Sequence, residues 1–204
     1  AAGLNQPPTP YHLGFVLGPR INAGGRIGDA ALGAKLLAGD DETEAQRIAQ
    51  LLDKLNKERK TIETAMLEEA VAEADARIDA DPDLPLVLIG SDAFHKGVVG
   101  LVASRLVERF QRPACVIAWE KAGDGSRGEG TGSLRSVAGV DIGGAVRAAV
   151  AAGHLVKGGG HAMAAGLTVR RDHQDTLAAF LRAEITSTAT LARARAGLDI
   201  DGAV

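Results

Sequence analysis

Hydrophobic residues divide the chain into a helical first part and a second part in which short apolar runs alternate with helical segments. Over residues 41–81, apolar residues recur at helical spacing, at Ile48, Leu52, Leu55, Ile62 and Met66. Pro82 and Pro85 end this pattern. The sequence therefore predicts a connecting helix of roughly 35 residues, which would be about 50 Å long.

Polar residues along this predicted helix indicate how it starts and what surrounds it. Either Asp41 with Glu44 or Thr43 with Gln46 can form a capping box at its first turn. Charged residues of both signs are dense in LDKLNKERKTIE, which is typical of a solvated helix with pairs along its own surface. A coiled-coil dimer is the alternative interpretation.

Beyond Pro85 the pattern becomes that of an α/β domain. LVLIG and ACVIAW are short apolar runs typical of buried strands, and residues 98–110 between them have helical periodicity. The later elements are a strand around 132–137, a helix over 141–152, a strand at LTVRR and a helix over 173–186. We therefore expect an α/β fold with a mixed sheet flanked by helices and preceded by the long connecting helix.

Four parts follow from this organisation. They are a linker and glycine- and arginine-rich turn with a short helix at Ala30–Leu37 (residues 1–40), the connecting helix (41–81), the α/β domain (82–190) and the start of a further, truncated domain (191–204). The stretch GDGSRGEGTG, whose glycine-rich core is 123–130, predicts a mobile surface loop within the third part.

Composition narrows the kinds of partner that the chain can bind. A net charge of -3 excludes a uniformly basic surface, so any nucleic-acid site must be a local patch. Aromatic residues make up 3% of the chain, so contacts to phosphate and backbone must outweigh base stacking. Cys115 is the single cysteine, which favours a reducing compartment such as the cytoplasm. Neither a run of about 18 apolar residues nor a signal-peptide pattern occurs, and no membrane partner is expected.

The string GGGHAMAAG at residues 158–166 is the most specific candidate for ligand binding. Gly158, Gly159 and Gly160 would let backbone N–H groups approach an anion closely. We expect the string to be a loop that leads into a helix, whose N-terminus would also favour negative charge. His161 could donate a hydrogen bond to the same anion. A flexible turn with an incidental histidine is the alternative for the three glycines taken alone.

The tetrapeptide Ser133-Leu134-Arg135-Ser136 is the second candidate. Alternation along a strand sends Ser133 and Arg135 to one face and Leu134 to the other. Arg135 offers a planar fork for a phosphate group, Ser133 offers a hydroxyl donor, and Ser136 is assigned to the same phosphate site. Taken by itself, the motif fits a surface salt bridge equally well.

Two further segments carry candidate contacts. His95 and Lys96 follow the first predicted strand of the domain, at the place where open α/β sheets form ligand crevices. Gly97 and Gly100 could instead serve to pack the next helix closely against the sheet. In GPRINAGGR (18–26), two arginines could follow a nucleic-acid backbone, unless the segment is a structural turn with solvated arginines.

GPRINAGGR, HKGVVGLVASRLVERFQRPACVI, GSLRSV and KGGGHAMAAG together resemble the DHH-type phosphoesterases, and most of all the RecJ exonucleases. The resemblance extends from about Gly14 to Ile185. It implies a DHH-associated substrate-binding domain with its connecting helix, without the catalytic DHH domain. A tryptophan is expected where this chain has Phe94.

The resemblance also implies roles for individual residues. Ser133 and Arg135 would hold the terminal phosphate or the first phosphodiester, while Gly159, Gly160 and His161 would lie on the side of the scissile phosphate. Arg20, Arg26, His95, Lys96 and Arg105 make up the set of predicted secondary contacts.

The function expected from the resemblance is binding of single-stranded DNA for a 5′-to-3′ exonuclease of DNA repair and recombination. Its partners would be the DNA strand and the DHH domain, and Mn²⁺ or Mg²⁺ would belong to that domain. No catalytic residue, metal ligand or cofactor is expected in this chain, because it contains no DHH triplet and the pair Asp199 and Asp201 lacks histidine neighbours. The alternatives are a phosphodiesterase of small oligonucleotides or cyclic dinucleotides and a non-enzymatic binding module.

Overall fold

The computed structural model describes residues 2–5, 7–120 and 128–195. The chain forms two compact units, Ala1–Ala65 and Met66–Val204. Their boundary falls inside helix α4 (Glu42–Ala80), which is a single helix of 39 residues. At 1.5 Å per residue this helix is about 58 Å long. The sequence placed a domain boundary near residue 82, whereas the second half of α4 belongs with the α/β unit.

The first unit consists of short helices that pack beside the start of α4. The elements are η1 (His12–Leu17), α1 (Gly18–Ile21), α2 (Ala23–Ile27) and α3 (Ala31–Ala38). The buried side chains of Leu32, Ile48 and Leu52 form its core. The expected short helix at Ala30–Leu37 is therefore confirmed as α3, one residue further along the chain.

The expected glycine-rich turn at GPRINAGGR is wrong, because these residues are helical. Pro19 lies in the first turn of α1, where its missing N–H group costs nothing. A Cβ atom at Gly24 would lie 2.6 Å from the carbonyl oxygen of Asp29 and 3.3 Å from Cδ2 of Leu52. Gly24 therefore serves close packing between helices rather than a turn.

Helix α4 begins as its sequence predicted, with Asp41 as the capping residue. Oδ1 of Asp41 accepts hydrogen bonds from the backbone N–H groups of Thr43 (2.9 Å) and Glu44 (3.2 Å). The side chain of Glu44 binds Arg47 instead of reaching back to complete the box.

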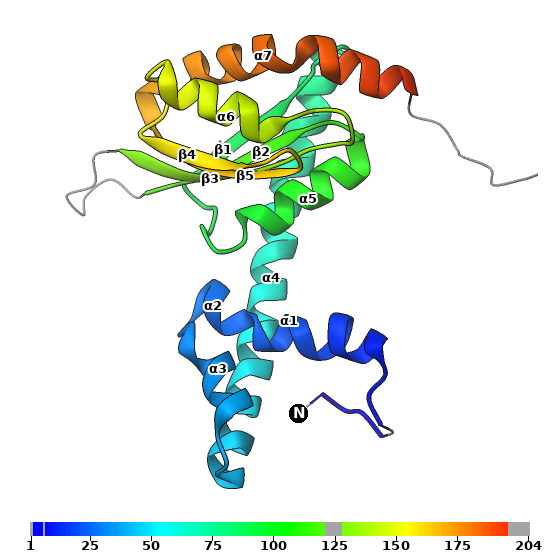
Figure 1. The fold of residues 1–204 in the computed structure, drawn as a ribbon, viewed down its shortest axis with the longest axis vertical. Helices are drawn as coiled ribbons and strands as arrows, with labels where there is room; N and C mark the ends of the chain where they lie inside the picture. Colours follow the sequence, from blue (N-terminus) through cyan, green and yellow to red (C-terminus); the bar gives the residue numbers. More distant parts are fainter. Residues whose placement is uncertain (1, 6, 121–127, 196–204) are drawn as a thin grey trace, which may run out of the picture. The chain divides into compact units, whose positions relative to one another are not determined.

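The second unit contains a five-stranded mixed sheet, as expected for an α/β fold (Figure 1). Its strand order is β1-β2-β3-β5-β4. β1 and β2 are parallel, and the remaining neighbours are antiparallel. The strands are β1 (Val87–Ser91), β2 (Ala114–Trp119), β3 (Glu129–Arg135), β4 (Lys157–His161) and β5 (Ala164–Arg170).

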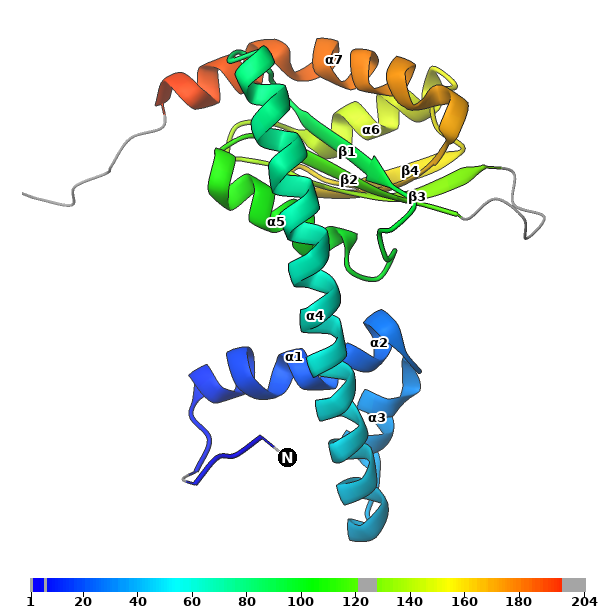
Figure 2. The same cartoon turned by 180° about the vertical axis from the view of Figure 1, so that it is seen from behind.

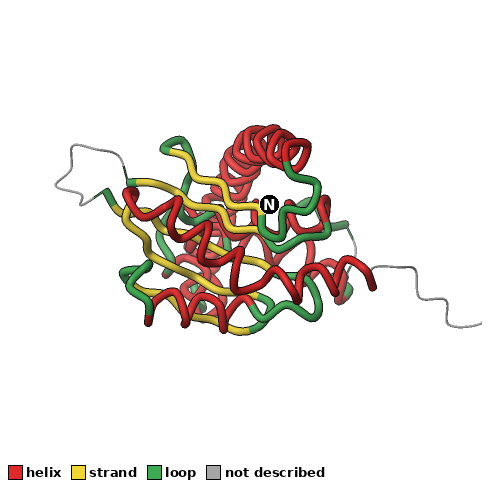
Figure 3. Tube along the Cα trace, turned by 90° about the horizontal axis from the view of Figure 1, so that it is seen from above, coloured by secondary structure: helices red, strands yellow, loops and turns green. Residues whose placement is uncertain are grey.

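Helices cover the two faces of the sheet unequally (Figures 1 and 2). Helices α6 (Ile142–Ala151) and α7 (Gln174–Arg195) lie over one face, and Figure 3 shows the strands as a layer between helices. The core between these two helices and the sheet includes Leu88, Leu134 and Leu177, each no more than 1% exposed. On the other face, α5 (Val99–Phe110) contacts β2 and β3. The outer strands β5 and β4 are thus left outside the cover of α5.

Helix α7 extends beyond the predicted end at residue 186, because Ile185 and Ala189 continue its buried face. Residues 191–195, expected to start a further domain, belong to this helix, and residues 196–204 lie outside the described part. The predicted loop 123–130 lies mostly outside it as well. Within the described ranges, no helix combines the length and the apolar character needed to cross a membrane.

The expected loop and helix start at KGGGHAMAAG is wrong, because this string forms the hairpin of β4 and β5. Helix α6 is hydrogen-bonded to that hairpin. The backbone N–H of Ile142, its first residue, donates to the carbonyl oxygen of Ala162 at 3.1 Å. Arg147 of the same helix donates to the carbonyl oxygen of Gly160 at 3.1 Å. Strand β5 rather than a helix follows the glycines, so the predicted contribution of a helix dipole at this position is wrong.

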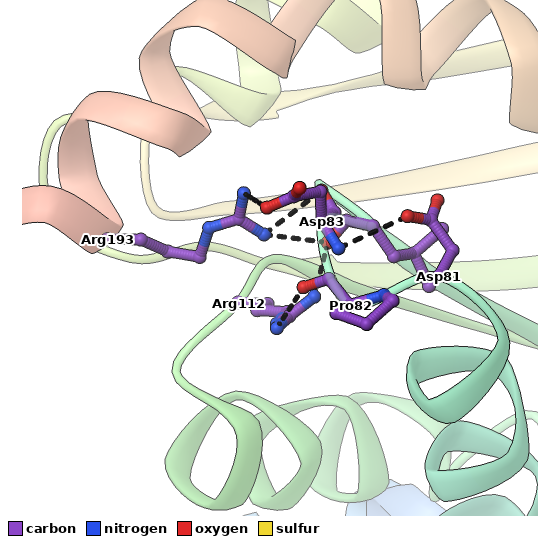
Figure 4. Close-up of polar contacts among 6 residues, drawn as sticks. Asp81, Pro82, Asp83, Arg112 and Arg193 are labelled. Carbon is purple, nitrogen blue, oxygen red and sulfur yellow. Dashed lines mark hydrogen bonds and ion pairs between the residues drawn. The ribbon is translucent and has the colours of Figure 1, made fainter.

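Two arginines hold the segment that joins α4 to β1 (Figure 4). Arg112 donates to the carbonyl oxygens of Pro82 and Leu84, both at 2.8 Å. Arg193, near the end of α7, donates to the carbonyl oxygen of Asp83 at 3.0 Å. Burial, with a contribution from the nearby charge of Arg193, lowers the pKa of Arg112. The path from α4 into β1 is therefore fixed by hydrogen bonds from α7 and from the turn before β2.

Candidate functional site

The sheet register places Arg135 and His161 on the same face. Arg135 of β3 lies opposite Ala164 of β5, which lies opposite His161 of β4. Directly paired residues on neighbouring strands point to the same side, so this row extends across three strands. Leu134 points to the opposite face and is fully buried there, which confirms the predicted alternation of this strand.

A second row runs parallel to the first and consists of Ser133, Gly166 and Gly159. A Cβ atom at Gly159 would meet nothing within 4 Å, and one at Gly166 would meet only the carbonyl oxygen of Gly132 at 3.9 Å. Glycine weakens the interior of a strand, and it often marks a place where a ligand or another backbone approaches closely. Packing among the described residues does not require either glycine, so their positions favour a ligand surface.

The other two glycines of β4 have structural roles. A Cβ atom at Gly158 would lie 2.7 Å from Cγ1 of Val146 in α6. At Gly160, φ is +156°, and a Cβ atom would lie 2.3 Å from the carbonyl oxygen of Ala164. The three consecutive glycines therefore separate into two that permit packing and one, Gly159, that keeps the sheet surface flat.

The first turn of α5 lies directly beside Ser133 and Arg135. Nη1 of Arg135 donates to Oγ of Ser133 at 2.9 Å and to the carbonyl oxygen of Leu134 at 2.8 Å. A Cβ atom at Gly100 would lie 3.0 Å from Nη2 of Arg135 and 3.1 Å from Oγ of Ser133. Helix α5 begins at Val99, and Val98 at its N-cap provides no side-chain hydrogen bond, while a helix start favours negative charge. The guanidinium of Arg135, the hydroxyl of Ser133 and the N-terminus of α5 therefore lie close together.

Ser136 lies beside this point but faces the protein interior. It is 4% exposed, and its hydroxyl donates to the carbonyl oxygen of Val140 at 2.8 Å. Its backbone N–H donates to the carbonyl oxygen of Met163 in the turn of the β4–β5 hairpin, at 3.0 Å. Ser136 thus links the end of β3 to the hairpin that carries His161.

His95 and Lys96 lie in the segment before α5, as the sequence indicated. Nδ1 of His95 accepts a hydrogen bond from the N–H of Gly97 at 3.1 Å, so this nitrogen stabilises its own turn. Lys96 is exposed. Arg105 is on α5, where it forms an exposed ion pair with Glu108 at 2.8 Å.

Arg20 and Arg26 belong to the first unit. Nε of Arg20 lies 2.8 Å from Oδ1 of Asp53 in α4, and Nη1 donates to the carbonyl oxygen of Val16 at 2.7 Å. Hydrogen bonds from Lys57 and from Arg20 hold the pKa of Asp53 below its usual value. Arg26 lies in the last turn of α2 and is partly exposed. Arg20 is therefore committed to the packing of its own unit, and its predicted DNA contact stays a prediction.

Two other kinds of site, a metal centre and a reactive cysteine, are absent from the described residues. In the part of the chain that the structure describes, no three histidine, cysteine, aspartate or glutamate side chains gather to hold a metal ion. The pair Asp199 and Asp201 lies outside that part. Burial raises the pKa of the Cys115 thiol to about 12, so this cysteine is a core residue rather than a nucleophile.

The α/β unit that contains this sheet matches a known class of domain. The family model of the DHHA1 domain matches residues 84–187, about half of the chain, and the chain belongs to this family. It is RecJ-like within the family: it is 43% identical over 166 residues to the single-stranded-DNA-specific exonuclease RecJ of Dickeya dadantii. That match covers 80% of this chain and 28% of the relative.

Solved structures agree with this assignment. The crystal structure of RecJ in complex with Mg²⁺ from Thermus thermophilus matches with a TM-score of 0.71 at 32% identity, over 88% of this chain and 26% of that chain. The structure of RecJ in complex with Mn²⁺ from the same organism matches with the same TM-score and identity, over 88% of this chain and 24% of that one. The chain thus spans about a quarter of the length of these RecJ proteins.

Proposed function

We propose that this chain is the single-stranded-DNA-binding part of a RecJ-like 5′-to-3′ exonuclease that acts in DNA repair and recombination. The observation that carries the proposal is the shared face of Arg135, Ser133 and His161, with Gly166 of β5 between β3 and β4 and with Gly159 beside His161, where a Cβ atom would meet no described atom within 4 Å. Membership in the DHHA1 family and the similarity to RecJ suggest the reaction, which is exonucleolytic hydrolysis of single-stranded DNA. This face would contribute to that reaction by binding the strand.

Arg135 and Ser133 would bind the 5′-terminal phosphate. A guanidinium presents parallel N–H donors to a phosphate group, and charge-assisted hydrogen bonds of this kind are roughly twice as strong as neutral ones. Both side chains stand beside the uncapped start of α5, whose partial positive charge also favours an anion.

The following nucleotides would lie along Gly166 and Gly159 toward His161. Because these two glycines carry no side chain on the open face, the sugar-phosphate backbone of the strand can approach the sheet closely. His161 is exposed at the end of β4 and would donate to a phosphodiester oxygen. This arrangement holds a strand by its backbone, which suits an enzyme that must accept every base sequence.

Hydrolysis itself would take place on Mg²⁺ or Mn²⁺ in the DHH domain of the parent protein, which would be the second partner of this surface. The described residues offer no group of ligands for such an ion. In this account the chain binds and positions the strand, and it does not cleave DNA by itself.

The binding role is tested by comparing two single strands of the same sequence, one with a 5′-phosphate and one with a 5′-hydroxyl. We expect tighter binding of the phosphorylated strand in fluorescence anisotropy. Arg135→Ala should weaken binding of that strand about tenfold, because it removes a charge-assisted hydrogen bond. It should also make the dependence of log K on log salt shallower by about 0.7 for each phosphate that the variant no longer neutralises.

Arg170→Ala is the matched control. Arg170 is also an arginine of this sheet, it is exposed, and it stands at the far end of β5, where it pairs with Asp172. The variant removes the same charge and should keep the preference for the 5′-phosphate. Equal binding of both strands by the unaltered chain, or equal weakening in the two variants, would overturn the proposed role of this face.

A further inference from the structure

Gly100 is a residue of the helix start beside the phosphate site that the proposed function leaves unexplained. It lies in the first turn of α5, and its φ is not in the left-handed region, so the backbone does not require glycine there. Glycine within a helix costs about 0.5–1 kcal/mol relative to alanine. A reason other than backbone geometry must therefore offset that cost.

The space that a side chain at Gly100 would take is occupied by the two phosphate-binding groups. A Cβ atom would lie 3.0 Å from Nη2 of Arg135 and 3.1 Å from Oγ of Ser133, and its next neighbour is Cζ of Arg135 at 3.7 Å. All three neighbouring atoms belong to these two side chains. None of these three nearest atoms belongs to a hydrophobic residue.

We infer that Gly100 is a positioning residue for the phosphate site. Its missing side chain leaves room for the guanidinium of Arg135 beside the first turn of α5, where its Nη1 donates to Oγ of Ser133. A methyl group at position 100 would push the end of the arginine side chain outward by a few tenths of an ångström or into another rotamer. The fork of Arg135 would then no longer point at the same place as the hydroxyl of Ser133.

This inference rests on the proposed function, and it predicts that Gly100→Ala lowers the phosphate preference without lowering the melting temperature. The preference of the chain for a 5′-phosphate over a 5′-hydroxyl single strand should fall about tenfold, as expected when a charge-assisted hydrogen bond is removed. The melting temperature should stay the same or rise, because the displaced group is the flexible end of a side chain and alanine favours the helix.

A second measurement reports on Arg135 directly. The Nε–Hε signal of Arg135 in a ¹H–¹⁵N spectrum, assigned by its disappearance in Arg135→Ala, should shift in Gly100→Ala. Gly14→Ala is the control, because Gly14 lies in helix η1 and a Cβ atom there would meet nothing within 4 Å. This control should change neither the phosphate preference nor the arginine signal.

The outcomes separate the inference from the proposed function. If Gly100→Ala keeps the phosphate preference, or if it melts at a clearly lower temperature, the positioning role of Gly100 is wrong, while a reduced preference in Arg135→Ala still supports the phosphate site. If Arg135→Ala keeps the preference as well, or the unaltered chain has none, the proposed function fails and the role of Gly100 fails with it.

Discussion

Individual glycines show how residues that look alike in sequence differ in physical role. The sequence grouped Gly158, Gly159 and Gly160 as one anion-binding loop. The structure gives Gly158 a contact with α6 and gives Gly160 a close approach to β5, and it leaves only Gly159 on an open surface. Sequence reasoning could not separate them, because the neighbours of each glycine come from elements that are distant in the chain.

This difference predicts unequal costs of substitution within β4. Gly159→Ala should change the free energy of unfolding by less than about 0.5 kcal/mol, because its Cβ meets no atom. Gly160→Ala should lower it by more than about 2 kcal/mol, because its Cβ would lie 2.3 Å from the carbonyl oxygen of Ala164, which is backbone and cannot swing aside. Urea unfolding of both variants provides the comparison, and similar destabilisation of the two would refute this division of roles.

Polar residues of the site were more accessible to sequence reasoning than the glycines. Strand alternation alone was enough to place Ser133 and Arg135 on one face and Leu134 on the other, and the structure confirms it. The burial of Ser136 and the open position of Gly166 were missed, and Gly100 was assigned only, as one alternative, to close packing of the next helix against the sheet. For Gly166 a signal existed, since it alternates with the buried residues of β5, but Gly100 could be interpreted only once α5 was placed against β3.

Elements with a strong hydrophobic pattern were predicted well. LVLIG and ACVIAW are β1 and β2, and the apolar spacing after Asp41 corresponds to α4. Strand β4 was missed because a run of glycines has neither periodicity nor β-propensity, and its pairing with β5 is a tertiary contact. Helix α2 was missed because its glycines suggested a turn, whereas Gly24 allows the helices to pack closely.

At the scale of elements, the joint between α4 and β1 gives a further prediction. Arg193 donates to the carbonyl oxygens of Asp83 (3.0 Å) and Leu84 (3.2 Å). Arg193→Ala should lower the free energy of unfolding by about 1 kcal/mol, the usual net value of such hydrogen bonds. It should also speed amide hydrogen exchange in residues 83–86.

The control for this joint is Arg195→Ala, which removes the same charge from an exposed position two residues further along α7. Exchange in residues 83–86 should remain slow in that variant. If Arg193→Ala left exchange there unchanged, the hydrogen bonds of Figure 4 would not be what fixes the path from α4 into β1.

At the scale of the whole molecule, the residues proposed to bind the 5′-phosphate belong to the second compact unit. This unit contains the DHHA1 match at residues 84–187 and the complete sheet. Arg20 and Arg26, the other arginines singled out in the sequence, belong to the first unit, and Arg20 is paired there with Asp53. Phosphate recognition is therefore proposed for the second unit alone.

The most direct test of this account is to record ¹H–¹⁵N spectra of the chain during titration with a short 5′-phosphorylated single-stranded DNA. The account predicts that the largest amide shifts fall on Ser133, Arg135, Gly159 and His161 and on the first turn of α5. The same strand with a 5′-hydroxyl should give smaller shifts at Ser133 and Arg135. Shifts that fell mainly on residues 18–26 or on the outer surfaces of α6 and α7, or that ignored the 5′-phosphate, would contradict it.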